Sequence, residues 1–387
     1  MQIKHLFLAS VALLPIQTIG LDIGFMTVKI SQVFFLSYLS ITVWRYRFRP
    51  LKSQKLVLYL LALTFIGLLV SAIFSNHPER SAILASAFLL CTLFYLAATV
   101  YLSSERESTE DLKKTLYITS TLYSIYGILQ LALFFSGATA NVNFEAWDLV
   151  PRVPYFSAEN VHAAFLLLVL PLIYDQLINS KNNTKNWLTL AFLINCAGMA
   201  ATGSRGAMLA LLLILTIQTL IGIVSHRINI KLITLTAVAA IALITTLWDI
   251  LFIRFEGIFS GDDGTTNVRI SHFKDMFRFF EASPIVGVGL GGSHALGFQD
   301  IHNVLLQVLF EGGVIAATPF TLALLIPTIR TTIKTNKITA FSLTFAAILM
   351  QAMFEPSLYF YHLYLALALT TSQSLMKYKI QIKANAQ

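Results

Sequence analysis

The sequence predicts an all-α polytopic membrane protein, with about twelve transmembrane helices and one large periplasmic loop that contains an amphipathic helix. Of the 387 residues, 56% are hydrophobic and 12% are charged, whereas soluble domains carry roughly 25% charged residues. Apolar runs long enough to cross a bilayer recur along the whole chain. We therefore expect residues 1–387 to form a single integral membrane domain, which excludes a soluble enzyme.

The predicted spans follow from these apolar runs, since a bilayer crossing needs about 20 apolar residues. They are 6–19, 26–44, 56–74, 81–102, 115–136, 160–178, 187–203, 206–225, 232–252, 302–328, 338–354 and 358–375. Two of the intervening loops are long, 137–159 and 253–301. Loops of this length in a compact protein usually have a function or are disordered.

The distribution of positive charge predicts the orientation. With these spans, 19 of the 27 Lys and Arg residues lie on the side of the termini and eight lie on the other side. Lys and Arg collect in cytoplasmic loops, so we expect both termini to be cytoplasmic and loops 137–159 and 253–301 to be periplasmic. The same rule accounts for the net charge of +8 without any nucleic-acid partner.

The second long loop has a helical pattern. Ile270, Phe273, Phe277 and Phe280 recur at helical spacing, and charged residues from Arg269 to Glu281 lie between them. This pattern is typical of an amphipathic helix that lies on a membrane surface.

The positive residues on the periplasmic side are the candidates for function, because they run against the orientation bias. Arg205 lies in a tight turn between two apolar spans, where an arginine is costly unless it is paired or faces a wet cavity. Arg152 and Arg269 lie in the two long loops. Each alone is consistent with a solvated or lipid-facing charge. Together they predict an anion site, because guanidinium groups bind phosphate oxygens through a bidentate fork.

His302 is the best candidate for a general base, because a neutral imidazole accepts a proton near pH 7. It lies where a predicted span begins, and there the helix dipole disfavours the imidazolium ion. Asp300 would act in the opposite direction, and a helix-capping or interfacial histidine is the alternative. His162, at the start of another span, is a weaker candidate.

Other signals are weaker. No acidic cluster is evident on the periplasmic side, so a metal site is not expected. Glu311 and Glu355 lie in or beside spans, where a carboxylate serves as a proton relay or pairs with an arginine. The segment 287–292 fits the GxGxxG pattern but lacks the strand–turn–helix context that gives the pattern meaning. We interpret it as a glycine-rich bend that approaches the membrane.

Two segments together resemble the O-antigen ligase/polymerase superfamily, the Wzy_C-like membrane glycosyltransferases. The first is Thr-Gly-Ser-Arg-Gly-Ala at 202–207, followed by an apolar span. The second runs from Arg269 through Pro-Ile-Val-Gly-Val-Gly at 284–289 to His-Asn-Val-Leu-Leu-Gln-Val-Leu-Phe-Glu-Gly-Gly at 302–313. A large outer loop before the histidine-bearing span also matches. The segment after Arg152 resembles another family motif, but Glu159-Asn160 departs from the usual Pro-Asn form.

The resemblance implies a glycosyltransferase of the bacterial inner membrane, with its site facing the periplasm. The donor would be a glycan on undecaprenyl diphosphate, within the membrane lipids, and the acceptor would be a lipid A–core sugar. His302 would activate the acceptor hydroxyl, and Arg205, Arg269 and Arg152 would bind the pyrophosphate. Asn303 and Glu311, in the same motif, would support them. Neither a cofactor nor a metal is implied.

Three members of the superfamily fit these features. The modest length favours an O-antigen ligase, and the alternatives are an O-antigen or polysaccharide polymerase and a protein O-oligosaccharyltransferase. A secondary transporter is the alternative from a different class, since twelve spans with cytoplasmic termini are also a common transporter plan. A transporter should have paired halves and broken helices near the midplane, and the sequence has no such symmetry.

Overall fold

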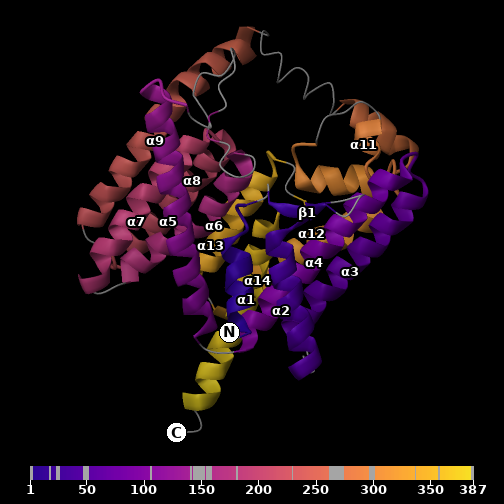
Figure 1. Ribbon diagram of the computed structural model, residues 1–387, viewed down its shortest axis with the longest axis horizontal. Helices are drawn as coiled ribbons and strands as arrows, with labels where there is room; N and C mark the ends of the chain where they lie inside the picture. The colour runs from indigo at the N-terminus through magenta and orange to yellow at the C-terminus, as the bar shows by residue number, and fades with distance from the viewer. Residues whose placement is uncertain are drawn as a thin grey trace.

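The computed structural model is a bundle of helices (Figure 1). It describes residues 3–16, 19–22, 27–46, 52–104, 107–139, 142, 153, 159–179, 182–228, 230–260, 274–295, 301–335, 337–355 and 358–384. The helices of the N-terminal half are α1 Lys4–Ala12, α2 Ile30–Tyr46, α3 Lys52–Ile73, α4 Pro78–Ser104, α5 Ser108–Phe135 and α6 Glu159–Asn179. Those of the C-terminal half are α7 Asn182–Thr202, α8 Arg205–Val224, α9 Ile230–Ser260, α11 Gly292–Ala295, α12 Val304–Thr335, α13 Ala340–Ala352 and α14 Tyr361–Ala384.

The helices agree with a multi-pass membrane protein. Among the described residues, six helices are long and apolar enough to cross a membrane, namely α3, α4, α5, α6, α8 and α12. The start of α1 and the end of α14 lie at the same end of the bundle (Figure 1). This placement fits an even number of crossings, whereas the cytoplasmic orientation stays a prediction.

The prediction of a first span at 6–19 is wrong. The helix there, α1, has nine residues and is therefore about 13 Å long, which is too short to cross a bilayer. The chain then forms an antiparallel hairpin of β1 Gly20–Asp22 and β2 Thr27–Lys29. The hairpin takes up the start of the predicted span at 26–44, and α2 begins only at Ile30.

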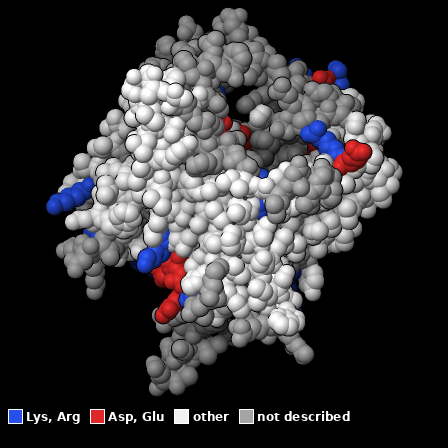
Figure 2. Space-filling model, in the orientation of Figure 1, with Lys and Arg blue, Asp and Glu red and all other residues white. Residues whose placement is uncertain are grey.

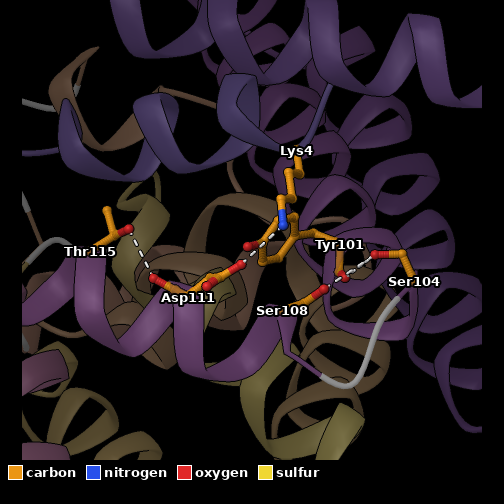
Figure 3. Close-up of polar contacts among 6 residues, drawn as sticks. All are labelled: Lys4, Tyr101, Ser104, Ser108, Asp111 and Thr115. Atoms are coloured by element: carbon orange, nitrogen blue, oxygen red, sulfur yellow. Dashed lines mark hydrogen bonds and ion pairs between the residues drawn. The ribbon is translucent and has the colours of Figure 1, made fainter. Parts of the chain in front are cut away.

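Polar contacts attach α1 to the bundle despite its length. Lys4 Nζ lies 3.4 Å from Asp111 Oδ2 near the start of α5 (Figure 3). Beside this pair, the hydroxyl groups of Ser104 and Ser108 lie 3.3 Å apart and join the end of α4 to the start of α5 (Figure 3). On the inner side of α1, the ring of Phe7 stacks on the ring of Tyr101 of α4, with ring centroids 4.7 Å apart. The charged pair is partly exposed, so the buried aromatic contact contributes most of the attachment.

Helix α6 is the centre of the bundle. All its residues from Val161 to Tyr174 are buried, and it packs against α5, α7, α8, α13 and α14. Polar side chains join the helices at a few points, such as Asn195 of α7, which bonds to Ser124 and Thr121 of α5. Such interhelical hydrogen bonds stabilise packing where lipid removes the hydrophobic driving force.

The second long predicted loop, 253–301, is partly helical. Helix α9 continues to Ser260, eight residues beyond the predicted end of its span. Residues 274–282 are also helical, and Met276 is 5% exposed against Phe310 and Leu306. Phe280 packs on the same cluster, whereas Phe277 is 55% exposed. The apolar residues of helix 274–282 are therefore divided: some pack against the protein and others are exposed on its surface. Ile270 and Phe273 lie outside the described residues.

Candidate active site

Arg205 is the first residue of α8. Helix α7 ends at Thr202, and Gly203 reverses the chain with a φ of 63°, a conformation that favours glycine. The Thr202 hydroxyl accepts a hydrogen bond from the Ser204 backbone N–H at 3.2 Å, which tightens the turn. The arginine therefore stands at a helix N-terminus, where the free N–H groups and the dipole also favour an anion.

His302 lies two residues before the start of α12. Asn303 caps this helix, because its side-chain oxygen accepts hydrogen bonds from the backbone N–H groups of Leu305 and Leu306 at 3.1 and 3.0 Å. Such a cap satisfies N–H groups that have no partner inside the helix. The His302 side chain remains 35% exposed. Asn303 thus fixes the backbone from which the imidazole projects.

Glu355 joins His302 from the connection between α13 and α14. Its Oε2 lies 3.8 Å from His302 Nδ1, which is longer than a hydrogen bond but within electrostatic range. Catalytic contacts are often long in an unliganded enzyme and shorten when the substrate binds. The carboxylate is therefore placed to orient the ring and to stabilise a positive charge on it. Sequence reasoning noted Glu355 but did not pair it with His302.

A close contact brings Arg205 to the same place. Gly206, the next residue, packs on Phe354, so that a Cβ on the glycine would lie 3.5 Å from Phe354 Cβ. Phe354 and Glu355 are neighbours in the chain. The start of α8, the residues before α12 and the end of α13 therefore meet, and we call Arg205, His302 and Glu355 the rim. Figure 2 shows a hollow in the upper part of the molecule with acidic atoms at its edge.

The other two predicted arginines, Arg152 and Arg269, lie outside the described residues. Val153 is described, and its backbone N–H donates to the Ala201 carbonyl at 3.0 Å. Ala201 lies near the end of α7, four residues before Arg205. The backbone next to Arg152 is thus held close to the turn that carries Arg205, whereas no described contact locates Arg269.

Glu311 has a different setting from the rim. It is 2% exposed, and its Oε1 accepts a hydrogen bond from Ser293 Oγ at 2.5 Å. It lies nine residues beyond His302, about 13 Å along α12 at the rise of a helix. In this structure the Glu311 side chain contacts the segment before α12 and lies away from the imidazole.

The glycine-rich segment 284–293 explains this setting, because it fills a break in α12. Gly313 interrupts the helix with a φ of 64° and a ψ of −171°. The Val288 N–H donates to the Phe310 carbonyl at 3.0 Å, and the Val314 N–H donates to the Pro284 carbonyl at 3.0 Å. Hydrogen bonds that the break removes from the helix are thus replaced by the inserted segment. We call this arrangement the clamp, and it agrees with a glycine-rich bend at 287–292.

His162 is less suited to act as a base. It is fully buried at the start of α6, next to the rings of Tyr123 and Phe165 at 5.9 and 6.4 Å. His302 is the more accessible of the two.

Within the described part of the chain, no three His, Cys, Asp or Glu side chains come together as metal ligands. The absence of a metal or cofactor from the reaction stays a prediction. The rim offers a fixed cation, an imidazole and a carboxylate at the ends of three helices. These groups are able to bind an anion and to accept a proton close by.

Comparisons with known proteins identify a family resemblance for part of the chain. No curated protein matches the chain. Residues 190–321 match the family model Wzy_C, described as O-antigen ligase, and this segment includes Arg205, His302 and the clamp. The match therefore confirms the predicted resemblance over residues 190–321 and is consistent with the O-antigen ligase superfamily.

Proposed function

We propose that the protein is an O-antigen ligase. It transfers a glycan from undecaprenyl diphosphate to a sugar hydroxyl of the lipid A–core, at the periplasmic face of the bacterial inner membrane. The Wzy_C match supports a lipid-linked glycan and a membrane enzyme. The donor, the acceptor and the side of the membrane are proposals.

The observations that carry this proposal are the 3.8 Å pair of His302 with Glu355 and the packing of Gly206, next to Arg205, on Phe354, next to Glu355. A diphosphate is a good leaving group once its charge is held, so the reaction needs a bound cation and a base close together. The rim has both, and the helix N-terminus beneath Arg205 adds to the positive potential. Arg152 and Arg269 are proposed as further ligands of the pyrophosphate.

The reaction then follows from these groups. The His302 imidazole takes the proton of the acceptor hydroxyl, and the hydroxyl oxygen attacks the anomeric carbon of the donor sugar. The bond between that carbon and the diphosphate oxygen breaks, and undecaprenyl diphosphate leaves with the electron pair. Arg205 stabilises the negative charge on the leaving group, while Glu355 orients the imidazole and stabilises the imidazolium ion. The proton on His302 returns to solvent.

Neither alternative within the superfamily differs in this chemistry, because a polymerase and a protein O-oligosaccharyltransferase change only the acceptor. The transporter alternative has one feature in its favour, the break in α12. In transporters such breaks line a cavity where backbone groups bind the substrate. Here the clamp fills the break with its own hydrogen bonds, which favours the enzyme.

The test is a lipopolysaccharide gel from a strain that lacks the gene, complemented with wild type or with His302→Ala. For a ligase, the strain that carries His302→Ala should accumulate free lipid A–core, with polymerised glycan still on its carrier, and the strain that carries the wild type should not. A core that carries a single repeat unit would contradict the ligase and indicate a polymerase. An unchanged ladder would reject both and direct the search to glycosylated proteins and then to transport.

A further inference from the structure

A polar cavity lies at the end of the bundle opposite the rim. It has a volume of about 590 Å³, is open to the outside, and is lined by the end of α6, the start of α7, the α8–α9 connection and the start of α9. Three of its lining residues are cations, Lys185, Arg227 and Lys231, and others are leucines, Leu177, Leu232 and Leu235. Cations and apolar side chains thus share one concave surface.

This cavity is separate from the proposed active site. Lys185 is near the start of α7 and Arg205 follows the end of that helix. The 17 residue-to-residue steps from Lys185 to Thr202 span about 26 Å at the rise of an α-helix. Figure 2 shows basic side chains at the left edge of the molecule, where Figure 1 draws the α8–α9 connection.

The charge of the cavity is not balanced by its own lining. None of its lining residues is acidic, and within the described part of the chain none of the three cations forms a salt bridge. The adjoining cavity, which Arg227 also lines, brings one carboxylate, Asp175, and a further cation, Lys337. The two cavities together therefore hold four cations and one carboxylate, and an anion of one or two charges would be attracted.

The surroundings indicate that this anion is part of a lipid. Trp187, two residues after Lys185, is 48% exposed, and tryptophan concentrates at the boundary between membrane and water. Val224 and Ile230, on either side of the α8–α9 connection, are 80% and 73% exposed. Apolar side chains at the edge of a cationic cavity suit a phosphate head group with acyl chains attached, whereas a free phosphate would make no favourable contact with them.

We propose that the cavity lined by Lys185, Arg227 and Lys231 is a binding site for an anionic phospholipid of the bilayer. The three cations contact the phosphate of the head group, and Leu177, Leu232 and Leu235 contact the first carbons of the acyl chains. A bound lipid would join the ends of α6, α7 and α9, and it would do so whatever reaction the rim performs.

Native mass spectrometry of the full-length protein in detergent tests the proposal, with phosphatidylglycerol and phosphatidylcholine added in turn. We expect phosphatidylglycerol to bind the wild type at least about tenfold more tightly than phosphatidylcholine, since each basic residue near the head group contributes to the attraction. The variant K185Q/R227Q/K231Q should lose this preference. Equal binding of the two lipids to the wild type would overturn the proposal.

A control variant separates the cavity from the general surface charge. K55Q/K114Q/R330Q removes three exposed cations from other helices and should keep the preference for phosphatidylglycerol. Loss of the preference in both variants would reject a specific site. If the triple cavity variant fails to fold, the single variants K185Q, R227Q and K231Q replace it, and each should weaken the binding of phosphatidylglycerol. The charge-preserving variants K185R and K231R should retain that binding. Displacement of the lipid by inorganic phosphate alone would reject the lipid and indicate a free-anion site.

Discussion

The rim and the clamp both use α12, yet they are built in opposite ways. At the rim, His302 is 35% exposed, and its contact with Glu355 is 3.8 Å long. At the clamp, Glu311 is 2% exposed and accepts a 2.5 Å hydrogen bond. Backbone hydrogen bonds of 3.0 Å join Pro284 and Val288 to α12. The first region has accessible side chains with loose contacts, and the second has buried groups with close contacts.

This difference separates two roles along α12 and the residues just before it. Groups that react must stay accessible and able to adjust when the substrate arrives. Groups that hold the helix in place must be buried and satisfied, because an unsatisfied polar group in an apolar interior is costly. We therefore expect substitutions at the rim to reduce activity without changing stability, and substitutions at the clamp to reduce stability first.

The largest effect is expected for His302→Ala. Removal of a general base reduces the rate by roughly 10²- to 10⁴-fold, whereas a side chain that is one third exposed contributes little to stability. Glycan transfer and thermal unfolding of the purified variant would be measured together. His5→Ala, which removes an exposed histidine of α1, should leave both unchanged. Wild-type activity in His302→Ala would show that His302 is not the general base.

Arg205→Lys should have the next largest effect. A point charge does not replace a bidentate fork, so we expect transfer to fall by roughly tenfold to a hundredfold, less than the full loss of a transition-state donor. The KM for the lipid-linked donor should rise. Arg278→Lys is the matched control, because Arg278 is exposed and is paired only with Asp275 at 3.6 Å among its described ion pairs. Equal rates for wild type and Arg205→Lys would argue against a pyrophosphate contact.

Gly313→Ala tests the clamp. A Cβ at this position would overlap the Ile285 carbonyl oxygen, so the inserted segment has to move, and the positive φ alone costs about 1–2 kcal/mol. The melting temperature should fall by several degrees. Gly137→Ala isolates the backbone strain, because Gly137 has a φ of 76° with no atom within 4 Å of the added Cβ. Equal shifts in the two variants would show that the clamp adds nothing.

Glu355→Gln should reduce kcat by about tenfold, because a hydrogen bond or ion pair to a charged group contributes about 1.5–3 kcal/mol and this contact is long. The amide keeps the shape of the side chain but does not stabilise an imidazolium ion. The KM for the donor should stay the same, in contrast to Arg205→Lys. If KM rises and kcat holds, Glu355 acts on substrate binding and not through His302.

Ser293→Ala has the smallest expected effect. The substitution removes the hydrogen bond to Glu311 and should lower the free energy of unfolding by about 1–3 kcal/mol, with the rate per folded molecule unchanged. Thermal unfolding in detergent provides the measurement, and the exposed Ser136→Ala provides the control. A loss of rate without a loss of stability would place Ser293 in the reaction instead of the clamp.

The sequence predicted most of the helices because each is an apolar run bounded by charges or turn residues. It failed at residues 6–29, since an apolar run does not show where the chain leaves the membrane to form a hairpin. Arg205 and His302 were identified because a charge or an imidazole beside an apolar span is unusual. Glu355 was not paired with His302, because their contact depends on how the end of α13 lies against the start of α12, which periodicity does not encode.

The sequence likewise did not predict the break in α12. Gly312 and Gly313 lie inside a continuous apolar run, and only the docking of residues 284–288 reveals why a glycine is required there. The GxGxxG pattern pointed to a bend without its partner. Local sequence thus predicted the elements and the candidate residues, whereas the contacts between distant segments came from the structure.

The most direct test of the central claim is transfer by the purified protein in lipid nanodiscs. The donor is a glycan on undecaprenyl diphosphate, the acceptor is lipid A–core, and the products are glycosylated core and free undecaprenyl diphosphate. We predict that the wild type forms both products in the presence of EDTA and that His302→Ala forms neither while remaining folded. Loss of activity in EDTA, or full activity in His302→Ala, would contradict a metal-independent transfer by the histidine and arginine of the rim.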